Sequence, residues 1–140
     1  MLPLALTQGD EDWEARIVAD FHRLSRTVLP TGPNANEAAR QWESRHRAFH
    51  EALLAGCGSP WLMRLHGQLV DQTERYRMIR LQRLSKNKPA ARDIHAEHRA
   101  LMEAVLARDV GQAVALMREH LKATFEATGK GLPPEPELSP

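Results

Sequence analysis

The sequence has little cysteine, no excess of either charge and no long apolar run, and each shortage excludes a class of protein. The single cysteine, Cys57, rules out an internal disulfide, so a reducing cytoplasm is the expected compartment, and its place between two glycines predicts a small buried residue at a turn. Lys and Arg number 19 against 18 for Asp and Glu, which provides no basic face for nucleic acid. No apolar run approaches the roughly 20 residues that a membrane span requires. The first residues, MLPLALTQGDEDWE, also lack the basic start and long apolar stretch of a signal peptide.

What the sequence does contain is helical periodicity. Apolar residues recur three and four positions apart over most of the chain, and no segment alternates apolar and polar residues as a strand would. Asp10 is the expected N-cap of the first such segment, where acidic residues suit the positive end of the helix dipole. One face of this segment carries Trp13, Ile17, Phe21 and Leu24. Further helices are expected at about 36–55, 59–84 and 90–107 and after a cap at Asp109, with breaks at PTGPN and SKNKP.

These elements predict an all-α fold, an antiparallel bundle of about five to six helices that spans residues 1–128. Pro60 is expected at the first position of its helix. Residues 129–140 are Pro-rich and polar, so a disordered tail is expected there. The sequence has no Gly-rich phosphate loop, no pair of cysteines and no nucleophile elbow. The apolar line of the 59–84 helix is Trp61, Leu65, Leu69, Tyr76 and Ile79.

Seven histidines are the one compositional excess. Four of them fall on apolar helix faces: His46 and His50, four residues apart, and the single histidines His98 and His120. A buried imidazole needs partners for both ring nitrogens, and several imidazoles that converge can share one metal ion. Zinc accepts neutral histidine nitrogens in near-tetrahedral geometry. A lone histidine on an apolar face is more often a core residue bonded to a carbonyl or carboxylate, so the spacing supports both interpretations about equally.

The remaining polar candidates rank lower. His22, His66 and His95 are expected to be structural or surface residues. Gln72 and Arg75 lie on adjacent turns of one helix, where a solvated face with i,i+4 pairs is the plain interpretation. The functional interpretation is that Arg75, with Gln72 beside it, reaches into a cavity of the bundle and holds a carboxylate with its planar guanidinium.

Two segments resemble a known family. The FCD domain, the effector-sensing module of FadR-type GntR transcription regulators, is similar to WESRHRAFHEALLAGCGSPWLMRLHGQLVDQTERYR and AEHRALMEAVLARDVGQAVALMREHL. The similarity runs from about Gly9 to Thr128. Metal-binding members of that family use an Asp and a His spaced D-x-x-x-H, followed by two later histidines. The resemblance therefore implies a metal site at His46, His50, His98 and His120.

Two departures from the family pattern accompany this resemblance. His46 stands where metal-binding relatives often carry Asp, so the site has one negative charge fewer and favours zinc, nickel or copper over a hard cation. If His46 does not ligate, the alternative is a site of three histidines and a water molecule. The resemblance implies that this sequence lacks the family's N-terminal winged helix-turn-helix, and that LPLALTQGDEDWE corresponds only to the final turn of the first family helix. Loss of that helix should leave an apolar groove, so a homodimer or a swapped oligomer is expected.

The function that the resemblance implies is sensing rather than catalysis. A small carboxylate effector would complete the coordination of a divalent metal, zinc or nickel, while Arg75 and Gln72 contact the effector. DNA would be reached only through the absent winged-helix domain. One alternative is a hydrolase-like metalloenzyme, but neither Glu43 nor Glu97 is well aimed at a metal-bound water, and Glu97 is expected about a quarter-turn from the cavity. The other alternative is a metal-free module that only dimerises.

Overall fold

The computed structural model of the chain describes residues 1–28, 35–84 and 93–129. These residues form helices and no strand, so the all-α class is confirmed. The helices are α1 (Leu2–Gln8), α2 (Glu11–Ser25), α3 (Ala35–Ala55), α4 (Pro60–Leu84), α5 (Ile94–Leu106) and α6 (Val110–Gly129).

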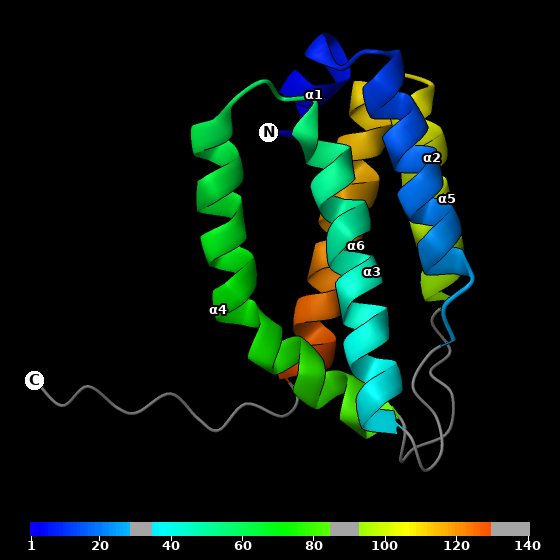
Figure 1. The fold of residues 1–140 in the computed structure, drawn as a ribbon, viewed down its shortest axis with the longest axis vertical. Coiled ribbons are helices and arrows are strands. Elements are labelled where there is room, and N and C mark those ends of the chain that lie inside the picture. The colour runs from blue at the N-terminus through cyan, green and yellow to red at the C-terminus, as the bar shows by residue number, and fades with distance from the viewer. Residues whose placement is uncertain (29–34, 85–92, 130–140) are drawn as a thin grey trace, which may run out of the picture.

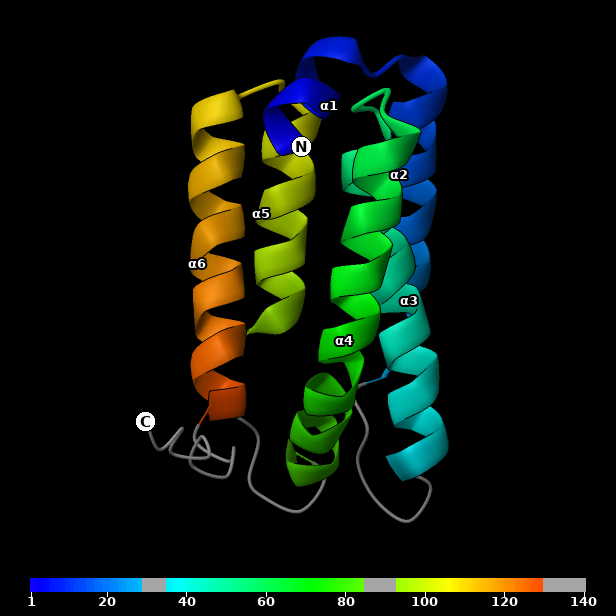
Figure 2. The same ribbon diagram turned by 90° about the vertical axis from the view of Figure 1, so that its left-hand side faces the viewer.

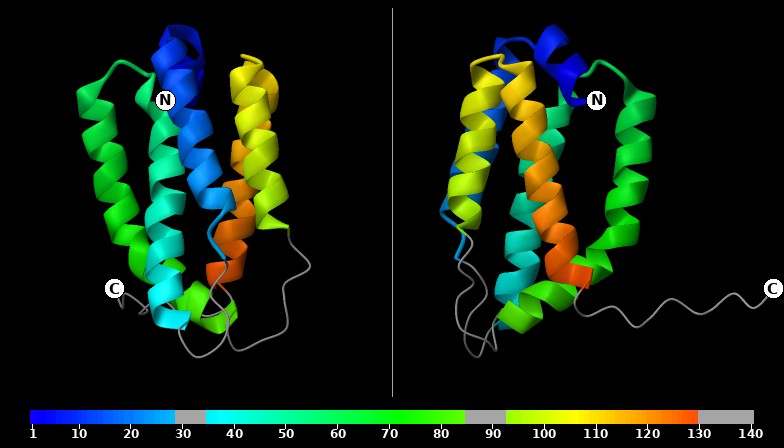
Figure 3. Two further views of the ribbon diagram at one scale, coloured as in Figure 1. Left: turned by 45° about the vertical axis from the view of Figure 1, so that its right-hand side comes forward. Right: turned by 180° about the vertical axis from the view of Figure 1, so that it is seen from behind.

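The five longer helices run alternately down and up the bundle, and α1 lies across one end (Figure 1). α2 packs against α3 and α5, α6 packs against α5 and α4, and α4 packs against α3, so the five helices close a ring. Figures 2 and 3 show this ring from other sides. α1 contacts α3 and α6 at the end of the bundle where the N-terminus lies. The predicted antiparallel bundle of about five to six helices is therefore confirmed.

Three helices begin at a capping aspartate. The side chains of Asp10, Asp93 and Asp109 each accept a hydrogen bond, at 2.9 Å, from the backbone N–H three residues further on. Each bond satisfies one of the backbone donors that a first helical turn leaves without an intrahelical partner. The caps predicted at Asp10 and Asp109 are confirmed. Asp93 starts α5 at Ile94, later than the sequence predicts, and residues 85–92 lie outside the described part of the chain.

The turn between α3 and α4 also follows the sequence. Cys57 is buried there, and Gly58 adopts a φ of 65°, a left-handed conformation that glycine takes without strain. Pro60 is the first residue of α4, and the Ser59 hydroxyl accepts a hydrogen bond from the Leu62 N–H at 3.3 Å. The predictions for Cys57 and Pro60 are confirmed.

The inner faces of α2, α3 and α5 form the hydrophobic core. Trp13 joins two of these helices, because its indole Nε1 donates a hydrogen bond to the Ala52 carbonyl at 2.8 Å. Burying a large apolar side chain stabilises the fold by about 1.5–3 kcal/mol, so these faces determine how the three helices pack. The largest fully buried apolar side chains are Trp42, Phe49, Ile17, Leu24, Leu53, Leu101 and Val105.

α4 is the least buried of the long helices, and none of its described side chains is fully buried. The apolar line predicted along it lies on its outer side: Trp61, Leu65 and Leu69 are 62%, 39% and 60% exposed. Periodicity identifies such a line but not the direction of the neighbouring helices, and α4 lies at the edge of the bundle against α3 and α6 (Figure 1). The other two members of the line, Tyr76 and Ile79, have side chains outside the described part of the chain.

Arg47 joins α3 to α4. Its guanidinium donates hydrogen bonds to Glu51 on its own helix and to Asp71 on α4. Hydrogen bonds to Glu51 and Asp71 raise the pKa of Arg47 above its ordinary value. The Arg47 side chain is 32% exposed, so each ion pair contributes about 0–1 kcal/mol to stability.

Arg108, in the turn between α5 and α6, holds the N-terminal corner of the fold. It adopts a φ of 56°, a left-handed conformation that is uncommon for residues other than glycine. Its guanidinium donates hydrogen bonds to the carbonyls of Leu6 (2.8 Å) and Gly9 (2.9 Å) and to the Glu14 carboxylate, and it lies 4.8 Å from the centre of the Trp13 ring. One residue in a turn therefore ties α1 and the start of α2 to the α5–α6 hairpin.

The described helices begin with α1 and end with α6, and the predicted domain boundaries stay a prediction. α1 has seven residues, about two turns, which is more than the single final turn that the resemblance implies. α6 extends to Gly129, one residue beyond the predicted boundary at 128. The predicted tail lies outside the described residues from position 130 onward. None of the described helices is both long enough and apolar enough to cross a membrane.

Candidate metal centre

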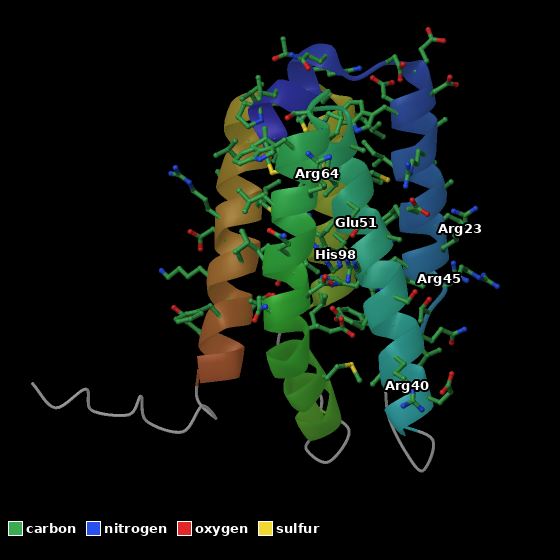
Figure 4. The ribbon with its side chains drawn as sticks, turned by 60° about the vertical axis from the view of Figure 1, so that its left-hand side comes forward. Arg23, Arg40, Arg45, Glu51, Arg64 and His98 are labelled. Carbon is green, nitrogen blue, oxygen red and sulfur yellow. The ribbon has the colours of Figure 1, made fainter. Side chains whose placement is uncertain are left out.

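Three helices bring four histidines to one place inside the bundle. α3 supplies His46 and His50, which are one helical turn apart and have ring centres 4.4 Å from each other. α5 supplies His98, and α6 supplies His120, whose ring centre lies 4.7 Å from that of His98. Figure 4 shows His98 in the interior of the bundle, whereas Arg23 and Arg45 extend from its outer side.

The donor atoms of these histidines converge. One ligand atom from each of His46, His50, His98 and His120 lies within 4.8 Å of all the others. The Nε2 atoms of His50 and His98 are 3.2 Å apart. In a tetrahedral zinc site with Zn–N bonds of ~2.0–2.1 Å, the donor atoms are about 3.3–3.4 Å from one another. The His50–His98 distance of 3.2 Å is close to this length, and the four donor atoms lie within 4.8 Å of one another, so the set could hold a small divalent cation.

The surroundings of the cluster are largely dry and apolar. His98, His120 and His46 are buried, with 0%, 4% and 8% of their surface exposed. The Trp42 ring stacks on His46, and the Phe49 ring meets His98 edge-on at 5.4 Å. His50 is half-buried, whereas the other three histidines are buried, so the cluster is most exposed on the His50 side.

Two carboxylates lie beside histidines of the cluster. Glu97 Oε2 is 2.9 Å from His120 Nδ1, and Glu43 Oε2 is 3.9 Å from His46 Nδ1. The sequence predicts that Glu97 lies a quarter-turn away from the cavity. In the structure its carboxylate contacts His120 on the neighbouring helix α6. Sequence reasoning considered both carboxylates only as candidate bases and missed their position behind the histidines, because that position depends on which helices are neighbours.

The other sequence candidates lie outside this cluster. His22 is exposed, and His66 and His95 are half-buried. Gln72 is exposed on α4. Arg75 belongs to the α4 backbone, but its side chain lies outside the described part of the chain, so the predicted effector contact stays a prediction.

Comparison with known proteins identifies the family of this chain. The FCD domain matches residues 1–123. An HTH-type transcriptional repressor, GlaR of Escherichia coli (strain K12), is 40% identical over 121 residues, which cover 86% of this chain and 54% of that protein. An uncharacterized HTH-type transcriptional regulator, BphR of Paraburkholderia xenovorans (strain LB400), is 39% identical over 121 residues, covering 86% of this chain and 48% of that protein.

The chain spans about half the length of these curated relatives. No solved structure matches it significantly. The family match covers all of α1 to α5 and most of α6, including the four clustered histidines. The chain therefore belongs to the FCD domain family.

Proposed function

We propose that this chain is the ligand-sensing and dimerisation part of a GntR/FadR-type transcription regulator, and that it binds a divalent metal ion and a small carboxylate effector at the four-histidine cluster. The observation that carries the proposal is the convergence of His46, His50, His98 and His120, from three helices, to within 4.8 Å. The FCD match and the two HTH-type relatives support a role in regulation rather than catalysis.

The donor set favours zinc, with nickel as the next choice. Four imidazoles are neutral ligands of intermediate softness, which suit zinc, nickel and copper better than magnesium or calcium. When bound, the metal supplies a Lewis-acid position at which a carboxylate oxygen of the effector can coordinate. His50 is the one clustered histidine that is not buried, so the effector is proposed to approach from its side.

α4 is the element proposed to hold the other end of the effector. It packs against α3 and α6, the two helices that carry His46, His50 and His120, so a ligand held between the cluster and α4 would contact all three elements. Arg75 and Gln72 are the proposed contacts, because a guanidinium binds a carboxylate through two parallel hydrogen bonds. The effector shifts the equilibrium between two arrangements only by the difference in its affinity for them.

Dimerisation is proposed at the exposed apolar side chains of α4 and α6. Trp61, Leu65 and Leu69 on α4 and Leu121 and Phe125 on α6 are each at least 39% exposed. Exposed apolar surface of this kind is typical of interaction sites. DNA contact is proposed for the remaining half of a longer regulator, since both relatives are named as HTH-type and extend beyond the matched region.

Catalysis is disfavoured by the position of the carboxylates. Glu97 is engaged with Nδ1 of His120 at 2.9 Å, so it is not free to act as a base toward a metal-bound water. Both relatives are named as transcription regulators. No observation on the described residues favours the hydrolase-like alternative.

Metal content of purified protein tests this proposal. The wild-type chain is dialysed against a chelator, reloaded with zinc and assayed by mass spectrometry, beside His98→Ala and the control His95→Ala. His95 lies on the same helix and is half-buried outside the cluster, so its loss should leave zinc binding intact. Wild type and His95→Ala should bind stoichiometric zinc, and His98→Ala should not. Equal and negligible zinc in all three would overturn the proposal in favour of a metal-free dimerisation module.

A further inference from the structure

The contact between Glu97 and His120 joins two helices directly behind the histidine cluster. Glu97 lies on α5, next to the candidate ligand His98, and its Oε2 is 2.9 Å from Nδ1 of His120 on α6. We propose that Glu97 is a positioning residue: it keeps the proton of His120 on Nδ1 and so presents Nε2 of His120 to the cation. This inference rests on the metal-binding function proposed above and assigns a role to a residue outside the ligand set.

The chemistry of the two partners determines where the proton lies. An ionised carboxylate has no proton to donate and only accepts hydrogen bonds, so Nδ1 of His120 must carry the shared proton. In a neutral imidazole the other nitrogen then holds the lone pair that a metal requires. The His120 ring lies 4.7 Å from the His98 ring and 5.0 Å from the His50 ring, between centres, so its Nε2 can join the facing Nε2 atoms of those two residues.

Charge gives Glu97 a second effect on the same site. Four neutral imidazoles bring no negative charge to a divalent cation, and the carboxylates beside these rings include Glu97, 2.9 Å from His120, and Glu43, 3.9 Å from His46. A carboxylate hydrogen-bonded to a ligating histidine raises the basicity of that ligand and fixes its orientation. Glu97 is only 31% exposed, so water screens its charge incompletely. Glu97 thus supplies from behind the ring part of the negative charge that a ligating aspartate would supply directly.

The position of Glu97 also links the site to helix packing. A single helix, α5, provides one candidate ligand and the support of another ligand on its neighbour α6. Any displacement of α5 against α6 would change the Glu97–His120 distance and the direction of His120 Nε2 together. The metal affinity of the cluster is therefore expected to depend on a residue that never touches the metal.

The test begins without metal. Nitrogen-15 NMR of the imidazole rings reports which nitrogen carries the proton, and it is recorded on metal-free wild type, Glu97→Gln, Glu97→Ala and the control Glu103→Ala. Glu103 is an exposed carboxylate on the same helix and away from the cluster. His120 should be the Nδ1–H form in wild type and in Glu103→Ala, and Glu97→Ala should populate the Nε2–H form.

Zinc affinity is then measured by chelator competition on the same four proteins. Glu97→Ala should bind zinc about 10–100-fold more weakly, as expected for loss of a carboxylate behind a ligating histidine, with Glu97→Gln in between and Glu103→Ala unchanged. An Nε2–H form of His120 in wild type, or wild-type affinity in Glu97→Ala, would overturn the assignment. If no protein bound zinc while His120 showed the expected proton position, the metal-binding function would fail and the Glu97–His120 contact would stand.

Discussion

The Nε2 atoms of His50 and His98 lie 3.2 Å apart although 48 residues separate them in the chain. Two imidazole lone pairs that face each other at this distance repel, unless a proton or a cation lies between them. One ring can carry that proton when no metal is bound, but a metal ion satisfies both rings at once. The relationship is therefore the most direct structural reason to test metal binding first.

Zinc should stabilise the folded chain. A ligand that binds only the native state raises the free energy of unfolding by ~2.7 kcal/mol when its free concentration is about 100 times Kd, which shifts Tm by several degrees for a domain of this size. Differential scanning calorimetry with and without zinc should show this increase for wild type and His95→Ala. His98→Ala should show none, and an equal increase in His98→Ala would place the bound zinc elsewhere on the chain.

Helical periodicity selected the four histidines as candidates, and the family resemblance supplied the expectation that they meet in one site. His46 and His50 share a face through their i,i+4 spacing, and His98 lies on the same apolar stripe as Leu101. Which helices become neighbours is a tertiary property, so the contact between Glu97 and His120 could not be read from the sequence. This contact joins residues 23 positions apart on two different helices, α5 and α6.

The same limit explains the error along α4. Trp61, Leu65 and Leu69 repeat at the helical period, as core residues do, yet they are exposed because α4 has neighbours on one side only. The left-handed backbone of Arg108 was equally hidden, since neither periodicity nor capping patterns indicate a positive φ at an arginine. Local rules thus located the helices and singled out the histidines that cluster, while the edges and cross-helix contacts required coordinates.

Substituting aspartate for His46 should change which metals the cluster prefers. His46→Asp adds a negative charge and an oxygen donor beside His50, which favours harder cations such as manganese over copper and nickel. Competition titrations with manganese, nickel and zinc should show a higher manganese-to-nickel affinity ratio than in wild type. His46→Asn is the matched control, because it has the same size without the charge. An equal manganese-to-nickel affinity ratio in His46→Asp and His46→Asn would show that the side chain at position 46 does not ligate the metal.

The hydrogen bonds of the Arg108 side chain should stabilise the fold, whereas its positive φ should destabilise it. Arg108→Ala removes hydrogen bonds to the carbonyls of Leu6 and Gly9 and should lower the free energy of unfolding by about 1–3 kcal/mol. Arg108→Gly loses the same bonds but relieves the positive φ, so it should be more stable than Arg108→Ala by about 1 kcal/mol. Urea unfolding measures both values. If the glycine variant were the less stable of the two, the backbone at this position would not be strained.

The exposed apolar side chains of α4 should determine the oligomeric state. Leu69→Glu places a charge among Trp61 and Leu65, so burial of this surface against a second copy would become costly. Sedimentation velocity should show a dimer for wild type and a shift toward monomer for Leu69→Glu. Val18→Glu is the control, because Val18 is an apolar residue of α2 that is 47% exposed on another helix. A wild-type monomer would contradict α4 as the dimer interface. Equal dissociation of both variants would also contradict it, because a new charge should weaken the dimer only where its side chain becomes buried between the two copies.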